Sequence, residues 1–451
     1  MGRFDLDDDD DEIVDPIKIT PELQSQAMKL LASDDLLYRV TNAVKRLGVV
    51  GEESNVLTVF LACVARSLLS PPLVIVKGAT SSGKSTVPTA VTQLFDPSLV
   101  LERSGLTEKA LAHGSGALAG QILLLDEHRC GKDAQQLLRL LQSEGRIAHE
   151  YTVTRGRFRE TATANRFGRP VVLTTTTELK VFDDDETRYL TIWSDESPEQ
   201  TLEILQARIR PRPKMDEQRL AVWRAATSLL TVLPGDFEQP PTWLEFVASR
   251  LPLGNVRLRR HWPRFLTFCC AVALCSGRRK KDLPLNITFK DYCVGHKILN
   301  PVFAATLEGI PGEEIELVRA LAKLGEQQGR GVTVREIADS LGWRTAQVYK
   351  RLRAALAQKL ISRDPGTHER NLKYYRGTER SVGRFLPSPR TVLENCPELG
   401  EEVIYVNPFT GEPTRIRAKK RVGGKIGGVA PSRCKHGVHQ GLCAKCAGFR
   451  E

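Results

Sequence analysis

Apolar residues recur at helical spacing through residues 19–69, and short apolar runs replace that spacing from Leu73 onward. The first stretch predicts three helices, with Pro21 in the first turn and Gly48 and Gly51 as breaks. The later runs LVIV, ILLLD and PVVLTTTT are separated by polar helical or loop segments. This alternation predicts an α/β core with a mostly parallel sheet.

The helical pattern returns over residues 200–305, and a further pattern begins at Gly312. It predicts a long helix, a short helix over Val334–Leu341, a turn at Gly342, a helix over Thr345–Lys359 and a β wing. This is the spacing of a winged helix-turn-helix.

Composition changes sharply at both ends of the chain. The start is acidic, and after Thr378 the sequence is rich in Pro, Gly and Arg, with too few apolar residues for a core. The predicted parts are an acidic disordered tail (1–17), N-terminal helices (18–70), the α/β core (71–200), a helical lid region (201–310), the winged helix (311–378), a basic flexible linker (379–430) and a compact tail (431–451).

Length and charge narrow the class of protein. A chain of 451 residues predicts several domains, and it has neither an apolar run long enough to span a membrane nor a basic-then-apolar start typical of a signal peptide. We therefore expect a cytoplasmic protein whose ten cysteines are mostly reduced. The net charge of +11 favours an anionic partner, nucleic acid first, although Lys and Arg also serve simply to solvate a surface.

The stretch VIVKGATSSGKSTV has the chemistry of a phosphate-binding loop. It matches G-x-x-x-x-G-K-[ST] between an expected strand and helix, over Gly78, Ala79, Thr80, Ser81, Ser82, Gly83, Lys84, Ser85 and Thr86. Glycines let backbone N–H groups turn toward phosphates, Lys84 reaches the β and γ oxygens, and Ser85 offers its hydroxyl to Mg²⁺. ATP and Mg²⁺ are thus the expected cofactors.

Three later segments extend this nucleotide chemistry. Asp126, at the end of ILLLD, can hold Mg²⁺, and Glu127 can polarise the attacking water; the alternative is a strand running into a solvated acidic turn. Thr176 or Thr177 could orient the same water, although threonine is common at strand ends. Arg188, just before another apolar strand, could stabilise charge on the transferred phosphoryl group.

The order of these pieces resembles an AAA+ ATPase. The stretches LLQSEGRIAHEYTV, VVLTTTTEL and RYLTIWSDES are similar to the helicase-like ATPase module of DNA primases from phages and mobile elements, itself similar to minichromosome-maintenance helicases. The resemblance spans roughly residues 18–375 and implies a ring, most simply a hexamer, with active sites between subunits. It implies that Arg188 acts on the neighbour's nucleotide.

The same resemblance implies that Arg260, in a segment like the family's second sensor, contacts the γ-phosphate. Arg257 and Arg259 lie near enough to leave that choice open. The primase and zinc-finger parts that accompany the module elsewhere are missing, so priming is not expected. The cysteine-rich tail is not part of the module.

Two segments have the character of DNA-binding surfaces. RIAHEYTVTRGRFRETAT predicts a β-hairpin whose tip carries Arg155 and Arg157, which in the resembled helicases would enter the ring channel; a solvated hairpin is the alternative. The expected recognition helix displays Arg344, Gln347, Lys350 and Arg351, which suit phosphates and base edges, although winged helices also dock proteins.

The end of the chain has zinc-ligand spacing. Cys434, His436, Cys443 and Cys446 form C-x-H-x6-C-x2-C, and His439 could substitute for His436. A segment this short would need Zn²⁺ for its folding energy, and the alternative is a disordered tail with chance cysteines.

The sequence therefore predicts an ATP-dependent motor that translocates on or unwinds DNA, with partners among replication or mobile-element proteins. Two other functions are consistent with most of the same features. One is an AAA+ ATPase that remodels a protein–DNA complex for transposition or helicase loading. The other is a DNA-binding regulator whose ATPase only switches its assembly.

Overall fold

The fold is known from a computed structural model. The structure describes residues 15–68, 70–113, 116–126, 131–155, 158–178, 187–209, 214–231, 241–253, 255–276, 286–308, 312–328, 330–357, 361–363, 373–376 and 386–418.

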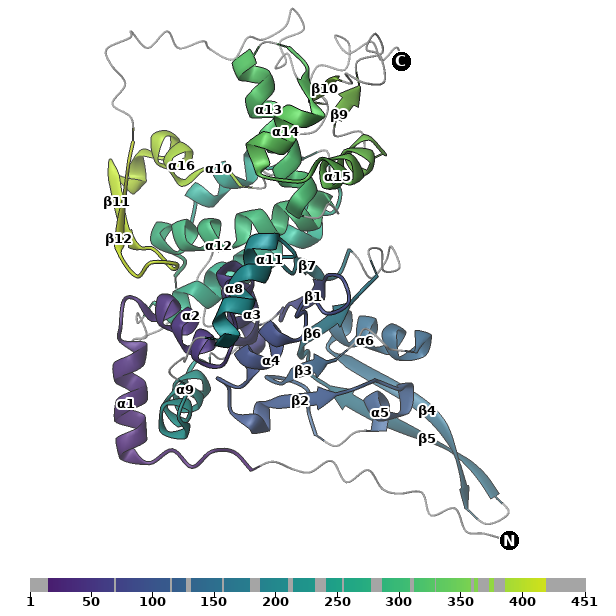
Figure 1. The fold of residues 1–451 in the computed structure, drawn as a ribbon. Coiled ribbons are helices and arrows are strands. Elements are labelled where there is room, and N and C mark those ends of the chain that lie inside the picture. Colours follow the sequence, from purple (N-terminus) through teal and green to yellow (C-terminus); the bar gives the residue numbers. More distant parts are fainter. Residues whose placement is uncertain are drawn as a thin grey trace, which may run out of the picture.

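A five-stranded sheet in the order β2-β3-β6-β1-β7 forms the centre of the molecule (Figure 1). All of its pairings are parallel, as the alternation of apolar runs predicts. The strands are β1 (Leu73–Lys77), β2 (Val100–Arg103), β3 (Ile122–Leu125), β6 (Val171–Thr176) and β7 (Leu190–Trp193). Strand β2, whose sequence VLER is only half apolar, is absent from the sequence-based expectation.

Alternate residues of each strand enter two different cores, as the two-residue period of a strand requires. On β1, Val74 and Val76 face one core, and Leu73 and Ile75 face the other. The first core contains α3 (Glu53–Val64) and α4 (Thr86–Thr92). The second contains α5 (Glu108–His113) and α6 (Lys132–Glu144). The sheet is therefore the middle of three layers, which fixes the direction of every loop that leaves it.

The N-terminal helices form as predicted. They are α1 (Pro21–Leu31), α2 (Leu36–Arg46) and α3, and Thr20 caps the first by accepting a hydrogen bond from the Leu23 N–H at 3.3 Å. Short 3₁₀ turns follow at Ala65–Ser67 and Pro97–Leu99.

The region after the sheet is helical, as predicted. It comprises α8 (Pro198–Ile209), α9 (Glu217–Leu229), α10 (Trp243–Ser249), α11 (Leu258–Cys275) and α12 (Phe289–Glu308). Helix α12 covers the free edge of β7, where the Thr306 hydroxyl accepts the Thr191 N–H at 3.0 Å and lies 3.1 Å from the Thr191 carbonyl oxygen. Residues of α1–α3, one sheet face and α9–α12 share a single core, so the expected boundaries at 70 and 200 do not separate independent cores.

Residues 386–418 are folded, which corrects the prediction of a flexible linker over 379–430. This C-terminal clip comprises α16 (Pro389–Asn395), a 3₁₀ turn (Pro397–Leu399) and the antiparallel strands β11 (Glu402–Val406) and β12 (Pro413–Arg417). Its apolar residues are few, but they enter the main core, Val392 and Leu393 among them. The Tyr292 hydroxyl also donates to the Pro387 carbonyl at 2.7 Å, and the Leu386 N–H donates to the Asn300 side chain at 2.8 Å.

A second unit with its own core follows α12. It contains α13 (Gly312–Gln328), β8 (Val332–Thr333), α14 (Val334–Leu341), α15 (Thr345–Ala357), β9 (Ile361–Arg363) and β10 (Lys373–Arg376). The strands form an antiparallel sheet in the order β8-β10-β9. The helices lie where the sequence predicts them, while the winged-helix assignment of this α13–β10 unit stays a prediction.

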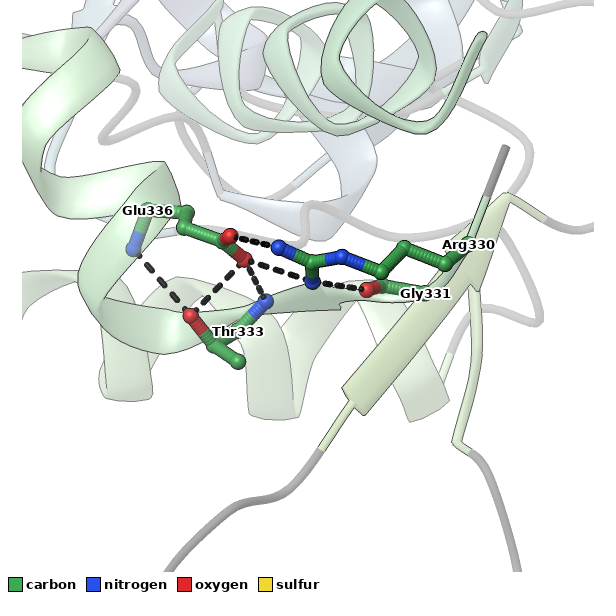
Figure 2. Close-up of polar contacts among 4 residues, drawn as sticks. All are labelled: Arg330, Gly331, Thr333 and Glu336. Carbon is green, nitrogen blue, oxygen red and sulfur yellow. Dashed lines mark hydrogen bonds and ion pairs between the residues drawn. The ribbon is translucent and has the colours of Figure 1, made fainter. Parts of the chain in front are cut away.

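Figure 2 shows how α14 begins. Thr333 and Glu336 form a reciprocal capping box, and Arg330 pairs with the Glu336 carboxylate at 2.5 Å. The hydrogen bond from Arg330 lowers the pKa of Glu336 to about 2. The ion pair thus strengthens a cap that the helix already has.

Candidate nucleotide-binding site

The loop between β1 and α4 turns through two left-handed residues, Ser81 at φ 68° and Gly83 at φ 81°. A side chain at Gly78 would not fit, because a Cβ there would lie 2.0 Å from the Ser194 Oγ and 2.6 Å from the Ser82 Oγ. Lys84 is half-buried and donates to the Ala79 carbonyl at 2.6 Å, while Ser85 and Thr86 are exposed. The local backbone is therefore the one that lets amide groups surround an anion.

A turn after β7 holds this loop from one side. The Ser194 hydroxyl lies 2.8 Å from the Ser82 hydroxyl, and Glu196 accepts the Ala79 N–H at 2.5 Å. Asp195 donates its N–H to Glu52 at 2.7 Å, and burial raises the pKa of that Glu52 carboxyl. Sequence reasoning missed these contacts, because they join segments more than a hundred residues apart.

The carboxyl ends of β3 and β6 lie beside the loop. Strand β6 separates β1 from β3, with Thr176 opposite Lys77 and Thr174 opposite Leu125. Asp126 is exposed at this edge, about 10 Å from the β1 end, since neighbouring strands are about 4.8 Å apart. Asp126 and Ser85 therefore emerge at one edge of the sheet, as a shared Mg²⁺ site requires. Glu127 lies outside the described residues.

The threonine hydroxyl that contacts the acidic strand is not one that the sequence singled out. Thr175 donates to the Asp126 carbonyl oxygen. Thr176 is buried and accepts the Glu178 N–H at 3.1 Å, while Thr177 is exposed. The run of four threonines gave no means to choose among them.

A cavity of about 280 Å³ opens beside the loop. Its walls come from residues 48–52, the phosphate loop and α8, and its apolar lining consists of Val49, Val50, Val87, Ile204 and Ala207. The Gln200 amide donates to the Val50 carbonyl at 2.6 Å and fixes α8 against the 48–52 turn. In the sequence, Gly48 and Gly51 predicted the turn that forms one wall of this cavity. They gave no indication that α8 forms the opposite wall.

A second cavity, of about 170 Å³, collects arginines. Arg139, Arg188, Arg260 and Arg264 line it, and none of the described residues around it is acidic. Burial, and after it the neighbouring charges of Arg260 and Arg188, lowers the pKa of Arg264 to about 10. Arg188 also donates to the Ser143 hydroxyl at 3.2 Å, and Arg260 to the Thr187 hydroxyl. Four arginine side chains therefore gather at this cavity.

The arginine cavity and the phosphate loop lie at opposite ends of the sheet. Leu190 pairs with Val74, so Arg188 lies level with Pro72, at the amino end of the parallel strands. The loop starts at Gly78, about 20 Å away at about 3.3 Å per residue. Arg260, expected to contact γ-phosphate, thus lies with Arg188 and not beside the loop of its own chain.

The predicted hairpin is present as β4 (Arg146–Arg155) and β5 (Phe158–Phe167), which pair antiparallel along their whole length and extend away from the sheet (Figure 1). Arg155 is the last residue of β4. Its side chain and the whole of Arg157 lie outside the described residues, so their proposed DNA contact stays a prediction.

Helix α15 presents a mixed cationic and aromatic surface. Arg344, Tyr349 and Lys350 are exposed, whereas Gln347 and Arg351 are partly buried. Arg344 and Lys350 are therefore accessible from solvent, and Gln347 and Arg351 are less accessible than their sequence spacing suggests.

The predicted zinc ligands Cys434, His436, Cys443 and Cys446 also lie outside the described residues. Within the described ranges, no group of three or more His, Cys, Asp or Glu side chains is arranged to hold a metal ion. In the same part of the chain, no helix combines the length and apolar character needed to cross a membrane.

Comparison with known proteins supports the reading of the loop. Residues 22–216 match a family model described as the MTBMA_p00010 P-loop domain. The chain thus contains a P-loop domain, which extends from α1 to the start of α9. No curated protein matches the chain.

Solved structures with detectable similarity are distant. An inhibitor-bound JCV helicase is 14% identical, with a TM-score of 0.25 over 64% of this chain and 66% of that chain. The chain therefore spans just under two thirds of that helicase. Drosophila ORC bound to DNA is 13% identical, with a TM-score of 0.23 over 84% of this chain and 93% of the other. The Aeropyrum pernix ORC1 protein in complex with DNA is 15% identical, with a TM-score of 0.20 over 82% and 96%. Similarities of this size carry no argument about activity.

Proposed function

We propose that this protein is an ATP-dependent DNA motor that assembles as a ring, most simply a hexamer, and serves the replication of a mobile element or phage. The observation that carries the proposal is the placement of the phosphate loop and the arginine cavity at opposite ends of one parallel sheet. Neither end has both the loop and the arginines, so a second copy completes the site.

The residues at the carboxyl end of the sheet suit ATP with Mg²⁺. Gly78 has no side chain, and a Cβ there would clash with its neighbours. The Lys84 ammonium group lies within the loop, where it donates to the Ala79 carbonyl. Ser85 and Asp126 are exposed. Ser85 and Asp126 would hold Mg²⁺, which supplies neutralisation of phosphate charge. The cavity beside the 48–52 turn, whose lining is partly apolar and also includes Glu52 and Arg208, would receive the base.

The chemistry would be divided between two subunits. In one, Lys84 binds phosphate oxygens, and Glu127 accepts a proton from the attacking water. In the other, Arg188 and Arg260 approach the same phosphates from the arginine cavity, joined by the partly buried Arg264. Arginines that stabilise charge only as the bond to the γ-phosphate breaks raise the rate more than they tighten binding.

The coupling to DNA would come from two surfaces. The β4–β5 hairpin would carry Arg155 and Arg157 into the ring channel, where they meet successive backbone phosphates. The α13–β10 unit would act as a winged helix, with Arg344 and Lys350 on phosphates or base edges and Gln347 and Arg351 at its rim.

A mixing experiment tests the shared site. Arg188→Ala and Lys84→Ala subunits should each lack ATPase activity, and a mixture should recover part of it, because an intact loop can then face an intact arginine cavity. Lys109→Ala, an exposed change on α5 that retains both sites, is the matched control. A fully active monomer in the presence of ATP and DNA would refute the ring.

Strand displacement on forked DNA then tests the motor. The unmodified protein should unwind with ATP, and replacing Arg155 and Arg157 with Ala should abolish unwinding while sparing basal ATPase. An ATPase that hydrolyses ATP but never unwinds would indicate the remodelling or regulatory function.

A further inference from the structure

The Ala79 residue of the phosphate loop is bound on both sides by charged side chains of the protein itself. Glu196 accepts its N–H at 2.5 Å, and Lys84 donates to its carbonyl at 2.6 Å. Phosphate loops bind anions through backbone N–H groups and a lysine, and a carboxylate is also an anion with oxygen acceptors. In the free chain, the loop therefore already has an internal anion.

Glu196 is held at this place by a short, fixed turn. Ser194 donates its N–H to the Lys77 carbonyl at 2.9 Å, and Asp195 donates its N–H to Glu52 at 2.7 Å. On the other side, Ser197 starts α8 by accepting the Gln200 N–H at 3.2 Å. These bonds fix the backbone of the turn, while the Glu196 side chain is exposed and leaves the loop by rotating about its own bonds.

We infer that the Glu196 carboxylate competes with the nucleotide for the phosphate loop, so that a nucleotide binds there only by displacing this carboxylate. The inference rests on the proposed nucleotide site. A triphosphate in the loop would place several negative charges within a few ångströms of Glu196, and like charges at such distances repel. Binding therefore breaks the Glu196–Ala79 contact, which is one of the bonds that join the turn before α8 to the phosphate loop.

This displacement links the two halves of the site. Helix α8 lines the cavity beside the 48–52 turn through Ile204 and Ala207, and its first turn is continuous with the Glu196 turn. When the carboxylate leaves, the start of α8 loses its contact with the phosphate loop, while the Gln200–Val50 bond still holds α8 at the other wall of the cavity. Glu196 thus lowers the affinity for nucleotide and couples occupancy of the loop to the position of α8.

The test compares two charge-neutralising variants. Glu196→Gln keeps an oxygen acceptor but loses the charge, and Glu199→Gln removes the same charge three residues later, on an exposed side chain of α8 that does not line the cavity. Titration with a fluorescent ATP analogue should show about five- to tenfold tighter binding for Glu196→Gln, or about 1.0–1.4 kcal/mol. Glu199→Gln should change affinity by less than about twofold, since its exposed charge is screened and, within the described residues, it lacks the hydrogen bond to the loop that Glu196 makes.

Glu196→Ala separates competition from a supporting role. If the carboxylate competes, this variant also binds more tightly; if it merely shapes the loop, binding weakens and Gln rescues it, which would overturn the inference. Equal effects of Glu196→Gln and Glu199→Gln would overturn it too. Lys84→Ala distinguishes a failure of this inference from a failure of the proposed function. If affinity for the ATP analogue does not depend on Lys84, this loop is not a nucleotide site and the proposed function itself fails.

Amide hydrogen exchange gives a second readout. In the unmodified protein, the ATP analogue should change exchange over residues 197–209. In Glu196→Gln, part of that change should be present before nucleotide is added. An α8 that exchanges identically in both proteins and does not respond to nucleotide would contradict the coupling.

Discussion

Gly78→Ala tests whether the phosphate loop has its shape because the turn after β7 presses against it. The new Cβ would lie 2.0 Å from the Ser194 Oγ and 2.6 Å from the Ser82 Oγ, two hydroxyls that are 2.8 Å apart. Ser194 must then rotate and lose its contacts with Ser82 and with the Lys77 carbonyl, the latter at 3.2 Å. Two hydrogen bonds at about 0.5–1.5 kcal/mol each place the cost at about 1–3 kcal/mol of the free energy of unfolding. Nucleotide affinity should fall with it, because the loop shifts.

The obstacle is identified by a double-mutant cycle. Ser194→Ala alone should cost about 1–3 kcal/mol, because the same two hydrogen bonds are lost without a clash. The double variant should cost about the same, not the sum, so the coupling energy should reach about 1 kcal/mol or more. The assays are denaturant unfolding and titration with the ATP analogue. Gly131→Ala is the control, since a Cβ there meets nothing within 4 Å and its φ is −56°. Strictly additive costs would show that Ser194 is not what excludes a side chain at position 78.

Two further outcomes concern the parts of the fold outside the site. The pKa of Glu336 is lowered to about 2, so its contribution is fully present above the ordinary glutamate pKa near 4.5 and should be lost as pH falls from there toward 2. After discounting for solvent screening, the free energy that protects the α14 amides from hydrogen exchange should fall by about 1 kcal/mol across that window. Glu336→Gln should remove this pH dependence. Asp339→Asn, an exposed change on the same helix, should retain it. Leu393→Ala, at a side chain 3% exposed in the C-terminal clip, should cost about 2–5 kcal/mol of the free energy of unfolding of the main core. Ile404→Ala on the outer face of the same clip, 39% exposed, should cost far less, and equal small effects would mean that the clip does not stabilise the core.

The local parts of the fold could be predicted because local signals decide them. Thr20 before Pro21 starts a helix, and Gly342 ends one by adopting φ 68°. The strands of the sheet are short apolar runs between polar segments, which is typical of parallel strands covered on both faces. These signals do not depend on distant residues.

The C-terminal clip shows where composition misleads. The average composition of this segment, rich in Pro and Arg, is typical of a linker. Nevertheless, Leu386, Val392 and Leu393 pack in the same core as α3. A few anchors suffice when a large apolar surface already exists to receive them, because each buried side chain adds about 1.5–3 kcal/mol. Averages over a window cannot show that the receiving surface is there.

The arginine cavity depends on long-range packing in the same way, and its energetics bear on assembly. Arg260 and Arg264, from α11, meet Arg188 through Thr187, whose hydroxyl and carbonyl both accept from them. The pKa of Arg264 is lowered to about 10 by burial and by its cationic neighbours, yet this value is still well above neutral pH. Arg264 therefore stays protonated, and the folded chain carries the cost of a partly buried charge near the like charges of Arg260 and Arg188. An anion in the cavity would relieve that cost, and a phosphate presented by a neighbouring loop is the anion that the proposed ring supplies. Nucleotide binding and subunit association would then favour each other, with the coupling located in these arginines.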